Sequence, residues 1–243
     1  MPIFYSPDFN ENSYEIVLSD NEYKHIKNTL RKSIGDTIEV TNGKRMLAVC
    51  EIKNIQNREI ILQINQTTYK EKSYPQIALA FALLKQHNDL IIEKCTELGV
   101  FEFYPFYAKR NVKVSLSDHQ LERLRKITVS AIKQCDSTHL PFIHEPVTYE
   151  KLLNSVTNQY TPILAWEEEQ KTSLVSVLDT TFKDICLIVG PEGGFEEREI
   201  SLAKKYNTQI VSLGNHILRA ETAAIAFTAQ TMFYQLGKNP AFY

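Results

Sequence analysis

The spacing of apolar residues divides the chain into a strand-rich first part and a second part in which strands and helices alternate. The pattern in the first part predicts a strand, a helix and three further strands. The helix is expected to begin after Ser19, because Ser19 and Glu22 form a capping-box pattern. The pair Asn42-Gly43 predicts a tight hairpin turn. The three strands after the helix are expected at Asp36–Thr41, Arg45–Ile52 and Arg58–Ile64.

A short, strand-rich unit with one helix predicts a small β-barrel of the kind that presents RNA-binding surfaces. The polar stretch Asn65–Ser73 follows it and ends before Pro75. This composition indicates a linker between two domains. We therefore predict a β-barrel domain over residues 1–70 and a second domain over residues 71–243.

The second part alternates short apolar runs with helix-like patterns, which predicts an α/β domain with a parallel sheet. One helix is expected to end at Gly99, which can adopt the left-handed terminal conformation. Another is expected to begin at Ser117, with Gln120 completing a capping box. The first of these helices covers Asn88–Leu98, and the expected strands are Ile77–Leu84, Val100–Phe106, Ile163–Ala165, Cys186–Val189 and Gln209–Ser212.

Two glycine-bearing segments follow the last two of these strands, and each leads into a helix-like pattern. The first is Val189–Phe195 and the second is Leu213–Ala224. Loops after parallel strands converge at one edge of the sheet, where open α/β folds place their ligands. The glycine spacing matches neither the dinucleotide-binding nor the P-loop fingerprint. The pair of loops therefore predicts a small-molecule site of another kind.

The residues in these loops are compatible with ligand binding, although each also has a purely structural interpretation. Glycine lets the backbone approach a ligand closely, and the N–H groups at a helix start are unpaired and partly positive. Glu192 can accept hydrogen bonds from ribose or amine groups, and Arg219 can hold an anionic or polarised carbonyl group. Alternatively, the glycines only allow tight packing, and Arg219 and Glu221 form a pair that fastens the loop.

The overall charge does not indicate a nucleic-acid-binding protein, since the formal net charge is −2. Basic residues nevertheless outnumber acidic ones between residues 109 and 133. A basic helix in this region either contacts the phosphates of a nucleic acid or has an ordinary face exposed to solvent. The basic residues are Lys109, Arg110, Lys113, Arg123, Arg125, Lys126 and Lys133.

The cysteines and the hydropathy of the chain argue against a metalloprotein, a disulfide-rich protein and a membrane protein. The 4 cysteines lie far apart and form no C-x-x-C pair, so we expect neither a zinc site nor a disulfide framework. The longest apolar run, Ile77–Leu84, is much shorter than the roughly 20 residues that span a bilayer. The first residues lack the basic start of a secretory signal. We expect a cytoplasmic protein with no membrane segment and no bound metal.

These residues together resemble the RsmE-type SPOUT methyltransferases, and the resemblance covers nearly the whole chain. It rests on Val189–Phe195, on Leu213-Gly214 with Ile217–Arg219 and Glu221–Ala223, and on Lys94 with Glu97–Val100 before Pro105. Supporting matches are His25, Leu30-Arg31, Arg110 and Gln134-Cys135.

The resemblance implies a trefoil-knotted α/β domain behind a PUA-like β-barrel, working as a homodimer with its active site near the subunit interface. It implies transfer of a methyl group from S-adenosylmethionine to N3 of a uridine in 16S ribosomal RNA of the small ribosomal subunit. The candidate catalytic residues are Arg219, which would stabilise charge on the uracil oxygens, and Glu221, which is either a base or a partner that orients Arg219.

Binding residues follow from the same resemblance. Contacts to the cofactor are expected from Leu84, Gly190, Pro191, Glu192, Gly193, Gly194, Leu213, Gly214, Ile217, Leu218, Thr222 and Ala223. Contacts to RNA phosphates are expected from Arg31, Arg110, Arg123, Arg125 and Lys126.

The chain departs from the family pattern mainly on the RNA side. The family commonly has an arginine near Ile3–Tyr5, glycine and arginine at Asp136-Ser137, proline and arginine at Asn215-His216, and threonine at Ala220. Three of these changes remove an arginine, and none touches the glycine loops. Two alternatives therefore stay open: a SPOUT enzyme that methylates a ribose O2′ or a transfer-RNA base, and an RNA-binding module without catalysis. A dinucleotide-dependent oxidoreductase is a more distant alternative, since its fingerprint is absent.

Overall fold

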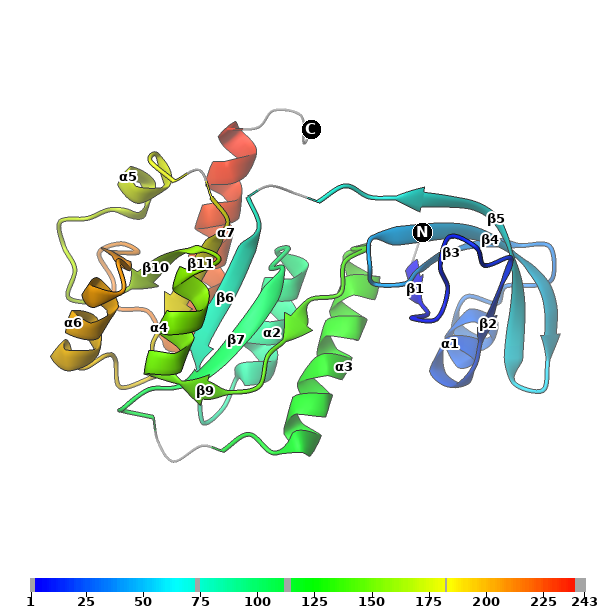
Figure 1. Ribbon diagram of the computed structural model, residues 1–243. Helices are drawn as coiled ribbons and strands as arrows, with labels where there is room; N and C mark the ends of the chain where they lie inside the picture. Colours follow the sequence, from blue (N-terminus) through cyan, green and yellow to red (C-terminus); the bar gives the residue numbers. More distant parts are fainter. Residues whose placement is uncertain (1–2, 73–74, 112–114, 182, 239–243) are drawn as a thin grey trace. The chain divides into compact units, whose positions relative to one another are not determined.

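The structure is a computed structural model that describes residues 3–72, 75–111, 115–181 and 183–238 (Figure 1). The chain forms two compact units. The first combines Met1–Lys72 with Val129–Leu140, and the second combines Ser73–Thr128 with Pro141–Tyr243. The chain therefore contributes to the first unit twice, the second time through the end of helix α3 (Asp118–Gln134) and the residues after it.

The first unit is built on a five-stranded sheet in the order β1-β3-β4-β5-β2. β1 runs parallel to β3, and the other neighbours are antiparallel. Successive side chains of a strand face opposite sides, and one side of these strands forms a core that includes Val40, Cys50 and Leu62. The strands are β1 (Ile3–Tyr5), β2 (Glu15–Leu18), β3 (Thr37–Thr41), β4 (Met46–Gln56) and β5 (Glu59–Tyr69).

The helix predicted after Ser19 is present, but it is short. α1 (Asp20–Lys24) passes directly into a π-helical turn, η1 (His25–Thr29). The wider turn places Ile26 in the core of this unit, where it is fully buried. Arg31 follows with a φ of +53°, at the point where the helical segment has ended.

The predicted linker is wrong over most of its length. β5 continues to Tyr69, and the residues after Asn65 pair with the first residues of β4. This part of β5 is largely exposed, so its polar composition suits a strand with little of its surface buried as well as it suits a linker.

The predicted hairpin at Asn42-Gly43 is present, since β3 and β4 pair as antiparallel neighbours, but its turn is longer than a tight one. β3 and β4 are joined by four residues, 42–45, in which Gly43 and Arg45 have positive φ values of +71° and +69°. The Asn42 side chain accepts hydrogen bonds from the N–H groups of Lys44 and Met46. The Gly43 carbonyl accepts one from Leu140 in the same unit, at 2.8 Å. The longer loop is therefore held by a distant segment of the sequence.

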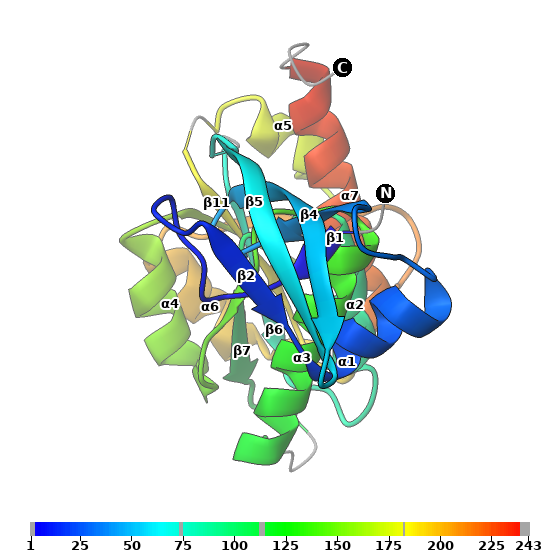
Figure 2. The same ribbon diagram turned by 90° about the vertical axis from the view of Figure 1, so that its right-hand side faces the viewer.

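The second unit is a parallel sheet in the order β12-β10-β11-β6-β7-β8, with β9 also pairing with β7, as the sequence predicts for this part of the chain. Figures 1 and 2 show α4 and α6 on one side of this sheet and α2 and α7 on the other. The strands are β6 (Ile77–Ala82), β7 (Glu102–Tyr107), β8 (Phe142–Ile143), β9 (Val147–Thr148), β10 (Thr161–Ala165), β11 (Ile185–Val189) and β12 (Gln209–Val211). The helices are α2 (Asn88–Glu97), α3, α4 (Tyr149–Thr157), α5 (Leu174–Leu178), α6 (Glu197–Lys205) and α7 (Ala220–Lys238).

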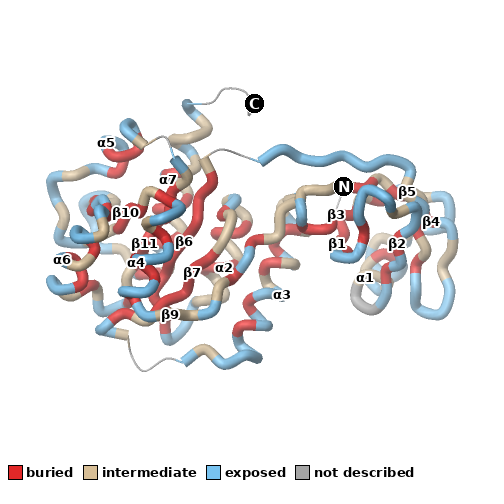
Figure 3. Tube along the Cα trace, in the orientation of Figure 1, coloured by how far each residue is buried: buried red, intermediate tan, exposed pale blue. Residues whose placement is uncertain are grey.

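The central strands are buried on both faces, as Figure 3 shows for β6. Leu79 lies in a hydrophobic cluster with side chains of α2, α3, α5 and α7. Its neighbour Ala80 lies in a second cluster with side chains of α4 and α6. An uninterrupted apolar strand is what such a two-sided environment requires.

Two helix boundaries are confirmed at the residues that the sequence indicates. α2 ends at Glu97 with Leu98 as its C-cap, and Gly99 follows with a φ of +89°. At the start of α3, the Ser117 hydroxyl accepts from the Gln120 N–H at 3.3 Å, while Gln120 Oε1 accepts from the Ser117 N–H at 2.9 Å.

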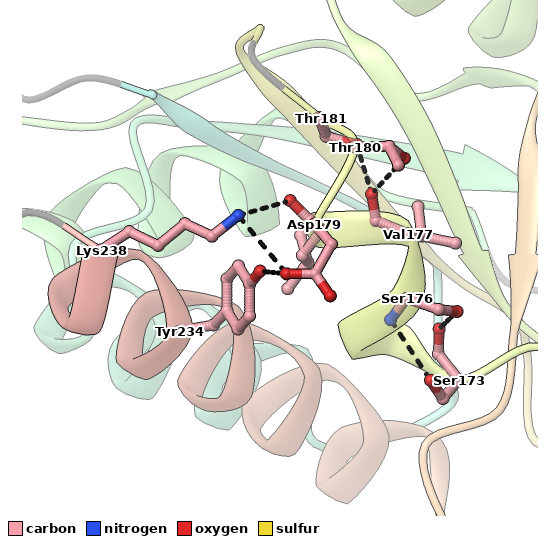
Figure 4. A network of polar contacts seen from close by, with 9 residues as sticks. Ser173, Ser176, Val177, Asp179, Thr180, Thr181, Tyr234 and Lys238 are labelled. Atoms are coloured by element: carbon pink, nitrogen blue, oxygen red, sulfur yellow. Dashed lines mark hydrogen bonds and ion pairs between the residues drawn. The ribbon is translucent and has the colours of Figure 1, made fainter.

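The end of α7 is fastened to the end of α5 by the polar network in Figure 4. The Tyr234 hydroxyl donates to Asp179 Oδ1, and Lys238 Nζ lies 3.5 Å from the same oxygen. The hydrogen bond from Tyr234 and the nearby lysine lower the pKa of Asp179, so this carboxylate stays ionised at neutral pH.

A second polar cluster lies at the amino end of β7. His144 Nε2 is 2.6 Å from Glu102 Oε2, and the Tyr160 hydroxyl donates to Glu102 Oε1. The Tyr104 ring stacks on His144, with ring centroids 4.0 Å apart. Burial would raise the pKa of Glu102, but the bonds from His144 and Tyr160 lower it, and the net direction is downward.

This cluster predicts an acid sensitivity that Glu102→Gln should remove. A carboxyl group whose pKa is lowered by folding stabilises the protein above its unfolded pKa, and that contribution is lost as the pH falls through the folded pKa. The free energy of unfolding of the natural protein should therefore fall below about pH 4.5 more steeply than that of Glu102→Gln. Urea unfolding at several pH values measures both slopes, with Glu150→Gln, an exposed glutamate of α4, as the control. Parallel curves for all three proteins would exclude the contribution.

Candidate functional site

A cleft of about 580 Å³ opens at the carboxyl ends of four neighbouring strands of the second unit. The residues that follow each of these strands line the cleft; the strands are β12, β10, β11 and β6. The walls are formed by residues 85–87, 165–167, 189–192, 194–195, 212–221 and 223. A volume of this size is typical of small-molecule sites, and the position agrees with the convergence of loops that the sequence predicts.

Most of the predicted site residues lie together in this cleft. Leu84, Gly193 and Thr222 do not line it. Leu84 is buried in the core, Gly193 packs against Arg110, and Thr222 is exposed on α7. The residues that do line it are Gly190, Pro191, Glu192, Gly194, Leu213, Gly214, Ile217, Leu218, Arg219, Glu221 and Ala223.

Two walls of the cleft are absent from the sequence-based predictions. Lys85, Gln86 and His87 follow β6, and Ala165, Trp166 and Glu167 lie at the end of β10. Both strands are predicted from the sequence, and the rule that ligands lie beyond the carboxyl ends of strands applies to them equally. The missing signal was glycine, which neither connection contains.

The glycines of the first loop leave room for side chains of the protein itself. A Cβ atom on Gly190 would lie 2.8 Å from the Phe195 ring, and one on Gly194 would lie 2.1 Å from Glu167 Oε1. A Cβ atom on Gly193 would meet Arg110 at 3.3 Å. The packing interpretation therefore accounts for Gly190 and Gly193, whereas Gly194 also has a φ of +69°, which favours glycine whatever the packing.

Gly214 in the second loop differs from the first three. A Cβ atom there would meet nothing within 4 Å, and the φ of +138° favours glycine.

Glu192 holds two walls of the cleft together. Its Oε1 atom accepts a hydrogen bond from the backbone N–H of Lys85 at 3.0 Å. The same loop is closed by the Gly194 N–H, which donates to the Pro191 carbonyl at 3.0 Å. One carboxylate oxygen of Glu192 thus has a structural role, which the sequence did not indicate.

Arg219 has no such partner. Its side chain is exposed at the cleft, and within the described ranges it makes neither an ion pair nor a side-chain hydrogen bond. The predicted alternative, an ion pair with Glu221 that fastens the loop, does not form. Arg219 also directly precedes the first turn of α7, where a positive charge is unfavourable. An unpaired cation in this position is available to a ligand.

The charges that line the cleft argue against a polyphosphate ligand. Three carboxylates, Glu167, Glu192 and Glu221, face two permanent cations, Lys85 and Arg219. A site for a dinucleotide or nucleoside triphosphate usually presents cations and backbone N–H groups to the phosphates. This cleft is better matched to a ligand that itself carries positive charge.

The candidate RNA-contact residues are all exposed, and several have acidic neighbours. Arg110 Nη1 donates to the Gly193 carbonyl at 3.0 Å, which places this arginine beside the first loop. Arg123 pairs with Asp89, and Arg125 lies 3.4 Å from Glu145. Arg31 belongs to the other unit, Lys126 is exposed on α3, and Lys113 lies outside the described residues.

Over the part of the chain that the structure describes, no cluster of three or more His, Cys, Asp or Glu side chains is arranged to hold a metal ion. No helix in the same residues is both long and apolar enough to span a membrane.

Comparisons with known proteins agree with this architecture. Residues 70–232 match the family described as RNA methyltransferase domain, and residues 18–65 match the RNA methyltransferase PUA domain. Ribosomal RNA small subunit methyltransferase E of Rickettsia conorii is 30% identical over 90% of both chains, and that of Mesomycoplasma hyopneumoniae is 32% identical over 86% of this chain and 90% of the relative.

Solved structures give the same result. The crystal structure of ribosomal RNA small subunit methyltransferase E from Neisseria gonorrhoeae bound to S-adenosyl methionine superposes with a TM-score of 0.86 and 25% identity, over 96% of this chain and 97% of that chain. A probable rRNA-methyltransferase from Porphyromonas gingivalis gives a TM-score of 0.88 and 25% identity, over 98% and 100%. The predicted fold class, a trefoil-knot α/β domain of the SPOUT type with a PUA-like barrel before it, is confirmed.

The packing at Gly190 predicts a clear stability difference between two glycine substitutions. Gly190→Ala drives a Cβ atom into Phe195, which is buried and packs against Tyr149, so we expect a loss of about 1–3 kcal/mol. Gly237→Ala near the end of α7 meets nothing within 4 Å and should be neutral or stabilising by up to about 1 kcal/mol. Chemical denaturation measures both. Equal stability of the two variants would show that Phe195 moves aside without cost.

Proposed function

The chain belongs to the RNA methyltransferase family of ribosomal RNA small subunit methyltransferase E, and from this membership we propose that it methylates N3 of a uridine in 16S ribosomal RNA with S-adenosylmethionine as the methyl donor. The observation that carries the proposal is the cleft in which both family loops meet, beside the unpaired Arg219. The family resemblance derived from the sequence is confirmed.

The residues of the cleft fit S-adenosylmethionine. This cofactor has an adenosine, a sulfonium cation and an amino-acid end, and it has no phosphate. The lining includes apolar residues such as Val189, Leu218 and Ala223, and it also offers backbone groups and carboxylates. We propose that Gly190–Glu192, Gly194, Leu213-Gly214 and Ile217-Leu218 hold it. Leu84, Gly193 and Thr222 would act through their neighbours, because they do not line the cleft.

The proposed chemistry needs a nucleophilic nitrogen. When bound, the cofactor supplies an electrophilic methyl group. A uracil N3–H must lose its proton before the nitrogen can attack, and negative charge then spreads to the neighbouring carbonyl oxygens. Arg219 can stabilise that charge, because its guanidinium is permanently charged and has no protein partner in the described part of the chain. Glu221, half-buried in the first turn of α7, is the candidate base or the group that orients Arg219.

The RNA side of the proposal rests on the two matched domains. We propose that the PUA-like unit, predicted over residues 1–70, contributes Arg31, and that the SPOUT domain over residues 71–243 contributes Arg110, Arg123, Arg125 and Lys126. Arg110 has the strongest structural support, because it borders the first loop. A ribosomal substrate also supports the predicted cytoplasmic location.

Methyl transfer to N3 of uridine predicts a specific product, and the assignment of Arg219 predicts different effects on turnover and on cofactor binding. Purified protein, S-adenosylmethionine and unmodified small-subunit RNA or subunits should yield 3-methyluridine in nucleoside mass spectrometry. Arg219→Ala should lower turnover by about a hundredfold or more. It should leave cofactor affinity within about twofold, because Arg219 is assigned to the uracil rather than to the cofactor. The fluorescence of Trp166, the only tryptophan, can report cofactor binding because this residue lines the cleft.

The control is Arg198→Ala, which removes an exposed arginine of α6 outside the cleft and should change neither quantity. Methylation of a ribose O2′ or of transfer RNA would support the alternative SPOUT target. Cofactor binding with no methylated product would support the binding module instead.

We also propose that the protein works as a homodimer, as the family resemblance implies. Two large apolar side chains are exposed: Ile217 in the cleft lining at 85% and Phe233, in the second half of α7, at 76%. Single exposed apolar residues are common on monomers, so the proposal depends on the resemblance, and these residues supply its test.

The dimer predicts an unequal effect of two phenylalanine substitutions. Phe233→Asp should convert the dimer to a monomer, because it would place a charge in the buried interface. Phe142→Asp, at a phenylalanine of β8 that is 59% exposed, should leave the dimer intact. Analytical ultracentrifugation measures the mass of each. A natural protein that sediments as a monomer, or a Phe233→Asp protein that stays dimeric, would contradict this interface.

A further inference from the structure

Glu167 occupies a distinctive position in the cleft. It follows β10, and its carboxylate lies over the backbone of Gly194 in the first glycine loop. A Cβ atom at residue 194 would lie 2.1 Å from Oε1 and 3.2 Å from Cδ of Glu167. Gly194 also has a φ of +69°, which favours glycine by itself, so the observation that counts here is the place of the carboxylate: it lines the cleft beside the loop that the family uses for its cofactor.

The turn that carries Glu167 is held in place at both ends. The Trp166 N–H donates to the Val211 carbonyl at 3.0 Å, and the Ser212 N–H donates to the Thr172 carbonyl at 2.9 Å. Inside the turn, Glu169 Oε1 accepts from the N–H groups of Lys171 and Thr172 at 2.7 and 2.9 Å. These bonds fix the backbone on either side of Glu167 before any ligand binds.

The Glu167 carboxylate itself has no cationic partner. Glu167 is exposed, and in the described ranges its carboxylate makes no ion pair and accepts no hydrogen bond; it lines the same cleft as Glu192. Glu192 differs, since one of its oxygens accepts from the Lys85 N–H. A carboxylate held over a loop and left without a counter-charge is a binding group for a cation.

We propose that Glu167 recognises a positively charged centre of the bound cofactor. The inference rests on the proposed function, because S-adenosylmethionine carries two such centres, the sulfonium and the α-ammonium group. Methyl transfer converts the sulfonium to a neutral thioether and leaves the α-ammonium unchanged. A carboxylate that faces the sulfonium therefore favours the substrate form of the cofactor over the product, S-adenosylhomocysteine, and promotes product release.

Glu167→Gln tests the assignment, because it keeps the size of the side chain and removes its charge. We expect the affinity for S-adenosylmethionine to fall about five- to tenfold in titration calorimetry, the effect of one charge-assisted contact. The matched control is Glu168→Gln, which removes the same charge from the next, exposed residue outside the cleft and should bind like the natural protein. Thermal unfolding verifies that both variants remain folded.

Two further ligands identify the centre that Glu167 faces. S-adenosylhomocysteine lacks the positive sulfur, and sinefungin replaces the methylsulfonium with an amine-bearing carbon. Weaker binding of S-adenosylmethionine and sinefungin, with S-adenosylhomocysteine unchanged, supports the sulfonium. Equal weakening of all three supports the α-ammonium.

Unchanged affinities in Glu167→Gln, or losses that Glu168→Gln reproduces, would overturn the inference while leaving the proposed function intact. Failure of the natural protein to bind S-adenosylmethionine would overturn both.

Discussion

The cleft depends on the backbone hydrogen bonds that hold two distant connections against each other. β12 lies at the edge of the sheet, whereas α7, which follows it, packs against the central strands β6 and β11. The chain must therefore return across the sheet past the connection from β10 to α5. The Trp166 N–H to Val211 carbonyl bond and the Ser212 N–H to Thr172 carbonyl bond join the two connections. Together with the pairing of β10 and β12, they position the wall with Glu167 and the start of the loop that leads to Arg219.

The first loop contains glycines at positions that face the protein's own side chains. The first loop closes on itself through Gly194 and Pro191, and the space that its glycines leave is filled by Phe195, Arg110 and Glu167. Interiors are packed closely enough that one added methyl group is felt. The loop is therefore packed against the protein's own side chains without any ligand. Walls that are packed in this way lower the cost of ordering a binding site.

The sequence was informative where local chemistry decides the structure. Gly99 and the Ser117–Gln120 pair define helix boundaries through their own backbone and side-chain bonds, and both are found as predicted. The sequence was misleading where contacts with a distant segment of the chain determine the local structure. The loop at Asn42-Gly43 is held by Leu140, and the polar residues after Asn65 extend a strand because β4 is long enough to pair with them. No local pattern contains that information. At Asp136 the sequence partly indicates the backbone conformation. The family commonly has glycine near this position. Asp136 adopts a φ of +54°, which aspartate tolerates better than most residues.

The charged residues of the cleft also have different roles. The carboxylates and the arginine suit different parts of the reaction. Two carboxylates line the cleft: Glu192 accepts a hydrogen bond from the Lys85 N–H, and Glu167 lies over Gly194. They form an anionic part of the wall, which suits a cofactor that carries positive charge. Arg219 precedes a helix start, where its charge is unfavourable, and no protein group in the described residues compensates it. A residue kept against a local electrostatic cost points to a ligand that uses it. In a methyl transfer to uracil, the partner of that cation is the oxygen on which negative charge develops, and the partner of the anionic wall is the cofactor that loses its positive charge in the same step.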